Sequence, residues 1–121
     1  MSPLFEAEVA GIEAMPEAVT VRLRGRVTFD EAPEVRKVLL GAVGKHAGSK
    51  LVLELAGVDE IDTSGAAVLA EALKAGMNRG LRVLLCSPSE SVIQIFRLAG
   101  FEDVLDHCCA DPQETWRRLQ A

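Results

Sequence analysis

The hydrophobic residues of the chain recur with two different periods, one typical of strands and one typical of helices. Within residues 18–25, apolar and polar residues alternate, which indicates a strand with one face in water. Residues 4–12 form an earlier short run of strand character, and we expect a turn between the two runs around residues 15–17. The chain therefore opens with two neighbouring strands.

Beyond residue 30 the spacing of apolar residues becomes helical in several segments. Asp30 and Glu31 stand at the expected start of the first helix, and Pro33 follows in the first turn, where its missing N–H costs nothing. Ser87 and Pro88 form another helix start, with the serine as cap and the proline at the first helical position. Helices are expected at residues 31–43, 64–78, 87–99 and 112–119.

Apolar runs between these helices predict further strands. Residues 51–55 and 81–86 are mostly apolar, as in strands buried inside a parallel sheet, and residues 104–105 suit a short edge strand. Residues 57–62 are expected to form a loop that leads into the helix at 64–78. The alternation of strand and helix requires a mostly parallel sheet with right-handed crossovers, so the chain is predicted to be an α/β protein.

The composition indicates what kind of protein this is and in which cellular compartment it is expected. The chain has 121 residues, of which 49% are hydrophobic, enough to fill a core without metals or disulfides. No stretch approaches the roughly 18 apolar residues of a membrane span, and the start lacks a secretory signal. The cysteines Cys86, Cys108 and Cys109 include no CxxC pair, which favours a reducing compartment. We expect a soluble cytoplasmic protein without membrane insertion, with Cys86 in the core and the other two as exposed thiols.

The charge and the motifs exclude several functions. The net charge of -5 argues against nucleic acid, whose affinity comes largely from Lys and Arg. The densest basic group, Arg22, Arg24 and Arg26, alternates along a strand and is expected on a solvated sheet face. His46 and His107 have no catalytic or metal-binding motif around them. We therefore predict no enzyme, no metal and no cofactor.

The segment of residues 58–65, Val-Asp-Glu-Ile-Asp-Thr-Ser-Gly, joins a predicted strand to a predicted helix. A helix N-terminus stabilises a phosphoryl group, so Thr63 or Ser64 could accept phosphate there without unfolding the helix. A phosphate beside the nearby acidic residues would make the surface strongly repulsive. The structural alternative is that Asp62 or Thr63 caps the helix and Gly65 allows close packing. Local chemistry leaves both interpretations open.

A family resemblance adds to this. Residues 57–69 resemble the signature of STAS domains, the family of bacterial anti-sigma-factor antagonists: an acidic residue, a hydroxyl residue, Ser or Ala, then Gly before a small apolar helix. The corner at Gly25, the run at residues 80–86, and Ser87-Pro88 with Phe96 and residues 99–101 also resemble the family. The resemblance covers about residues 18–106. It implies one STAS domain over residues 1–121, with a mixed, mostly parallel sheet of about four to five strands and helices packed on it.

The resemblance also implies a function. Thr63 takes the place of the phosphorylated residue, with Ser64 as the second choice. The family implies binding to an anti-sigma factor or serine/threonine kinase, switched off by phosphorylation. The residues it places at the partner interface are Asp59, Asp62, Ser64, Gly65 and Thr28.

The sequence departs from the family pattern in two places. Thr28 stands where antagonists usually carry an acidic residue, and Ala66-Ala67 replace the commoner Leu-Gly pair. The first departure counts against a kinase substrate, and the second changes the docking face. A different role for the same family is the soluble STAS subunit of an Mla-type ABC phospholipid transporter, bound to the permease. The sequence does not separate the two roles well.

Overall fold

The computed structural model describes residues 5–12, 15–46 and 50–120. In this part of the chain the strands form a five-stranded sheet in the order β1-β2-β3-β4-β5. β1 is antiparallel to β2, and the remaining neighbours are parallel. The bounds are β1 Phe5–Ile12, β2 Met15–Val27, β3 Lys50–Ile61, β4 Arg82–Cys86 and β5 Cys108–Cys109. The predicted mixed α/β architecture and its order of elements are confirmed.

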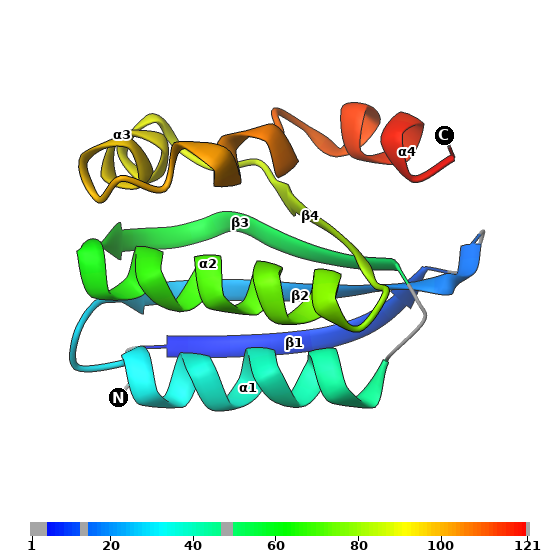
Figure 1. Cartoon of the computed structure of the whole chain (residues 1–121), viewed down its shortest axis with the longest axis horizontal. Coiled ribbons are helices and arrows are strands. Elements are labelled where there is room, and N and C mark those ends of the chain that lie inside the picture. The colour runs from blue at the N-terminus through cyan, green and yellow to red at the C-terminus, as the bar shows by residue number, and fades with distance from the viewer. Residues whose placement is uncertain (1–4, 13–14, 47–49, 121) are drawn as a thin grey trace.

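Helices connect the parallel strands. α1 (Ala32–Lys45) follows β2, α2 (Thr63–Asn78) follows β3, and α3 (Glu90–Leu98) follows β4. A short 3-10 helix, Glu102–His107, precedes β5, and α4 (Pro112–Gln120) ends the described chain. α1 and α2 lie side by side across the strands, while α4 lies apart from them (Figure 1).

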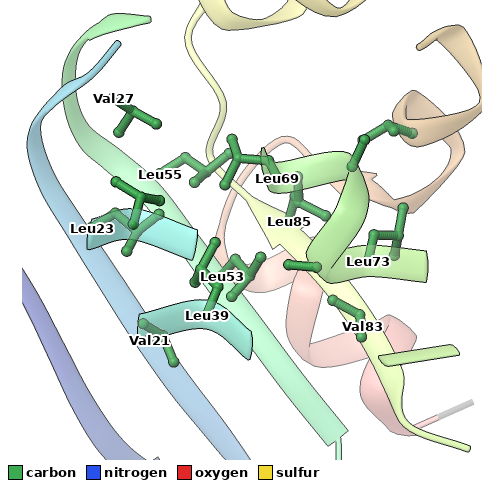
Figure 2. Close-up of a cluster of buried hydrophobic side chains, with 14 of the residues drawn as sticks. Val21, Leu23, Val27, Leu39, Leu53, Leu55, Leu69, Leu73, Val83 and Leu85 are labelled. Carbon is green, nitrogen blue, oxygen red and sulfur yellow. The ribbon is translucent and has the colours of Figure 1, made fainter. Parts of the chain in front are cut away.

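The two faces of the sheet bury different apolar clusters. Alternate residues of β2, β3 and β4 pack against α1, α2 and α3, and Figure 2 shows Leu55 of β3 beside Leu69 of α2, with Leu53 beside Leu39 of α1. The opposite face holds Met15, Ala18, Val52, Leu84, Cys86, Cys109 and Leu119, with Trp116 of α4 packed on them. Trp116 and Leu119 thus lie on the same face of α4. Both faces are therefore buried in residues 51–53 of β3 and residues 83–86 of β4, as these apolar runs require, whereas the end of β3 exposes Asp59 and Glu60.

The predicted loop over residues 57–62 is wrong as to its start, because β3 continues to Ile61. The extension pairs with β2 through two register shifts, and Gly57 fits beneath the Leu23 carbonyl, only 2.9 Å from where a Cβ would stand. β2 also begins earlier than predicted, at Met15, so the expected turn around residues 15–17 is wrong. Leu4, predicted as part of the first strand, lies outside the described residues.

The start of α3 also differs from the prediction. Ser89 rather than Ser87 is its N-cap, and the Ser89 hydroxyl accepts a hydrogen bond from the Val92 N–H at 3.2 Å. Ser87 has φ 58, a left-handed conformation outside the extended one that an N-cap takes. It turns the chain between β4 and α3, and its N–H donates to the Cys109 carbonyl.

The last strand lies further along the chain than predicted. The expected strand at residues 104–105 is wrong, since these residues belong to the 3-10 helix and the edge strand is Cys108–Cys109. The exposed thiols predicted at the same place are wrong as well: Cys109 is buried and Cys108 is half-buried. Cys86 is a buried core residue, as predicted.

Candidate functional site

The N-terminus of α2 is capped by Asp62. β3 ends at Ile61, and Asp62 remains extended, with φ -126, so its side chain can turn toward the helix. One carboxylate oxygen, Oδ1, accepts a hydrogen bond from the Gly65 N–H at 2.9 Å. Of the two caps considered from the sequence, Asp62 is the one used. Thr63 is thereby the first residue of the helix, and its side chain is exposed.

Gly65 allows α2 to approach β2 very closely. A Cβ at this position would lie 1.8 Å from the Val27 carbonyl oxygen, a distance at which no side chain fits. The glycine is buried, and Val27, at the end of β2, is also fully buried. The close packing predicted for Gly65 is present, and it brings the first turn of α2 against the end of β2.

The second carboxylate oxygen of Asp62 reaches the loop between β2 and α1. Oδ2 accepts a hydrogen bond from the Phe29 N–H at 2.9 Å, across 33 positions of sequence. One carboxylate therefore joins the N-terminus of α2 to the loop that precedes α1. Hydrogen bonds to a charged acceptor are roughly twice as strong as neutral ones.

The same loop is held on its other side by Glu31. Glu31 Oε1 accepts hydrogen bonds from the Thr28 hydroxyl at 2.6 Å and from the Thr28 N–H at 3.2 Å. The hydrogen bond from the Thr28 hydroxyl is the main cause that holds the pKa of Glu31 below its ordinary value, and nearby Arg26 acts in the same direction. Arg26 Nε lies 3.9 Å from Glu31 and 3.2 Å from Glu60 Oε2 of β3. Glu31 is buried and ionised, with a cation beside it.

Sequence reasoning missed the role of Glu31. The string Thr28-Phe29-Asp30-Glu31 has the Ser/Thr-x-x-Glu spacing of a capping box, in which the glutamate accepts from the N–H of the first residue. That spacing could have identified the pair. Thr28 itself is buried, and its carbonyl accepts from the N–H groups of Glu31 and Ala32.

A groove runs between the starts of α1 and α2. Its apolar floor comes from both helices, and Phe29 stands at its rim with 72% of its surface exposed. Arg36 of α1 and Glu71 of α2 form an ion pair between the two helices, with Arg36 Nε 3.1 Å from Glu71 Oε2. The residues that line the groove are Phe29, Asp30, Ala32, Pro33, Arg36, Ser64, Ala67 and Val68.

The predicted site residues occupy different positions relative to this groove. Ser64 is half-buried and lines the groove, next to exposed Thr63. Asp62 and Gly65 build the corner behind it, and Thr28 is buried below the loop. Asp59 is exposed near the end of β3 and does not line the groove. Sequence reasoning also missed Phe29. Whether an isolated phenylalanine is buried or exposed cannot be deduced from its neighbours in the sequence.

Within residues 5–12, 15–46 and 50–120, no group of three or more His, Cys, Asp or Glu side chains is arranged to hold a metal ion. Within the same ranges, no helix is both long and apolar enough to cross a membrane.

Comparisons with known proteins agree on one fold for the chain. The STAS domain family matches residues 9–115. An anti-sigma factor antagonist from Mycobacterium paratuberculosis superposes with a TM-score of 0.80 at 13% identity, over 97% of this chain and 95% of that one. The Bacillus cell fate determinant SpoIIAA in its phosphorylated form gives a TM-score of 0.68 at 17% identity, over 94% and 99% of the two chains.

The same fold also occurs inside a membrane transporter. Murine solute carrier 26 family member A9, an anion transporter, superposes with a TM-score of 0.70 at 13% identity. The match covers 96% of this chain and 22% of the transporter. At these identities the superpositions show a shared fold.

Proposed function

Because the chain belongs to the STAS domain family, we propose that it acts as an anti-sigma-factor antagonist-like regulator, a binding module and not a catalyst. In this proposal it binds an anti-sigma factor or a serine/threonine kinase of that type, and phosphorylation at Thr63 ends the binding. The observation that carries the proposal is the exposed Thr63 at the first position of α2, directly beside the groove between α1 and α2.

The groove supports a docking role for this surface. Phe29 exposes a large aromatic surface next to Ala67 and Val68, and exposed aromatic side chains at apolar patches are typical anchors of protein interfaces. Ser64, among the predicted interface residues, lines the groove directly. Asp62, Gly65 and Thr28 contribute by fixing the two walls, and Asp59 extends the surface along β3.

The charges around Thr63 support an electrostatic switch. The kinase would transfer the γ-phosphoryl group of ATP to Thr63 Oγ1, which loses its proton, and ADP would leave. The phosphate adds about 1.5 to 2 negative charges at neutral pH. The first turn of α2 contains no acidic residue, so its N–H groups and dipole favour the phosphate within the chain. A partner that docks in the groove meets a new anion together with Asp59, Glu60 and Asp62.

A second candidate is the soluble STAS subunit of an Mla-type ABC phospholipid transporter, docked on the permease. The fold shared with the anion transporter favours it, since a STAS-like unit there forms part of a transport protein. In that role Thr63 and Ser64 would make contacts to the permease, and Thr63 would carry no phosphate.

The experiment that separates the two is affinity capture from native lysate that includes solubilised membranes, with identification by mass spectrometry. The proposal predicts capture of an anti-sigma-type serine kinase, and phosphate on Thr63 of the endogenous chain. Capture of a permease with its ATPase, and unmodified Thr63, would establish the transporter role instead.

Variants test the site within the same experiment. We expect Thr63→Glu to lose the kinase, and Thr63→Ala to keep it but resist inactivation. Gln113→Glu, an exposed position on α4, adds the same charge away from the groove and should bind like the wild type. Equal binding by both Thr63 variants and the wild type would show that this surface is not the docking site.

A further inference from the structure

Phe29 is held in place through its backbone while its side chain remains free. Its N–H donates to Asp62 Oδ2, and the preceding residue, Thr28, is fixed to Glu31 by both its N–H and its hydroxyl. Phe29 is nevertheless 72% exposed as a residue. An exposed aromatic residue on a fixed backbone loses little conformational entropy on binding, which makes it an effective anchor.

Asp62 is the link between this anchor and Thr63. Its carboxylate divides its two hydrogen bonds between the Gly65 N–H in α2 and the Phe29 N–H in the loop, each at 2.9 Å. Thr63 is the next residue in the chain. Any new charge on the Thr63 hydroxyl therefore arises beside the group that holds the loop.

From this arrangement we propose that Asp62 is a positioning residue, which holds Phe29 in its docking position, and that phosphate on Thr63 acts by releasing Phe29. The inference rests on the proposed function, since it concerns how the same site is regulated. The phosphate repels the adjacent carboxylate and competes with it for the N–H groups at the start of α2. When the carboxylate moves, the Phe29 N–H loses its acceptor, and the anchor is no longer fixed opposite Ala67 and Val68.

The release is measurable on the isolated full chain by amide hydrogen exchange in NMR. The chain is compared without modification and with phosphothreonine incorporated at position 63 during synthesis. We expect phosphorylation to speed exchange of the Phe29 N–H about tenfold or more, the effect of losing one charge-assisted hydrogen bond. The control is the Val92 N–H, which is held in the same way by the Ser89 side chain at the start of α3 and should not change.

A variant separates the two hydrogen bonds of Asp62. Asparagine caps helices as well as aspartate does, but it has one acceptor oxygen in place of two. In Asp62→Asn the Gly65 N–H should therefore keep its protection from hydrogen exchange. The Phe29 N–H should exchange about tenfold faster than in the wild type, even without phosphate. Adding phosphate to Asp62→Asn should then change Phe29 exchange little, because the acceptor is already gone.

The outcomes distinguish this inference from the proposed function. Unchanged Phe29 exchange after phosphorylation would overturn the release while leaving the switch intact, if captured kinase is still lost. Equal acceleration at Phe29 and Val92 would indicate general destabilisation and also overturn it. Local acceleration at Phe29 with full retention of the kinase would support the release and remove phosphorylation as the control of binding.

Discussion

Gly65 shows how one missing side chain determines the position of the site. The backbone of α2 contacts the Val27 carbonyl at a distance that excludes any Cβ, so the contact fixes where Thr63 and Ser64 lie relative to the loop at Phe29. A substitution there tests the fold and the site together.

We expect Gly65→Ala to lower the free energy of unfolding by about 3 kcal/mol or more, because α2 must move away from β2. Gly41, in the interior of α1, is the matched control: a Cβ there meets no atom within 4 Å. Gly41→Ala should raise stability by about 0.5–1 kcal/mol, as expected for a helix interior. Urea unfolding of both variants measures the difference, and equal effects would contradict the close contact at Gly65.

Cys108 illustrates chemistry that burial suppresses. Burial is the main cause that raises the pKa of the Cys108 thiol to about 11, and the neighbouring Cys109 adds to it. At pH 8 about one Cys108 in a thousand is a thiolate, the form that reacts with alkylating reagents. We expect iodoacetamide to label Cys108 much more slowly in the folded chain than in urea, as read by mass spectrometry. Labelling at the same rate in both states would show that the thiol is accessible and ionised.

The helices and strands themselves were largely predictable, and the errors have physical causes. Period-two and helical patterns identify the parallel strands and their helices because each element buries one continuous apolar face or stripe. The extension of β3 to Ile61 was not predictable, since it depends on pairing with β2 and on two register shifts. The prediction at residues 104–105 failed because a short apolar pair fits a 3-10 turn as well as an edge strand.

The site was also predictable only in part, because local sequence rules identify some of its residues and long-range contacts place the others. Asp62 as a cap and Gly65 as a close contact follow from local sequence rules. The hydrogen bond from Phe29 to Asp62 spans 33 positions and arises only when β2 and β3 end side by side. Long-range contacts of this kind are properties of the sheet and not of any segment.

Glu31, at the start of α1, leads to a prediction about how stability depends on pH. Glu31 has a lowered pKa in the folded chain, so it stabilises the fold above the pKa of the unfolded glutamate, roughly 4.3, and that contribution is lost as the pH falls through the folded value. Glu31→Gln should therefore be less stable than the wild type at pH 7, and the gap should narrow toward pH 3. Urea unfolding at several pH values measures it. A gap that stays constant with pH would show that the charge of Glu31 is not involved.

The whole molecule separates stability from binding, because the two faces of the sheet carry different clusters. α4 packs Leu119 and Trp116 on the face of the sheet opposite α1 and α2, while the groove lies between the helices of the other face. A change beneath α4 should therefore alter folding without altering the docking surface, and a change at the groove rim should do the reverse.

We expect Leu119→Ala to cost about 2–5 kcal/mol of stability, as for a buried leucine, and to leave affinity for the captured kinase unchanged under conditions where the variant is folded. Phe29→Ala should change stability by less than about 0.5 kcal/mol, as at exposed sites, and weaken binding tenfold or more.

Leu98→Ala, at a position 79% exposed on α3 and outside the groove, controls for the loss of an exposed apolar side chain and should bind normally. Urea unfolding and titration calorimetry on the three variants provide the comparison. Equal loss of binding in Phe29→Ala and Leu98→Ala would mean that the partner contacts a surface much wider than the groove, and the anchor at Phe29 would then have no special role.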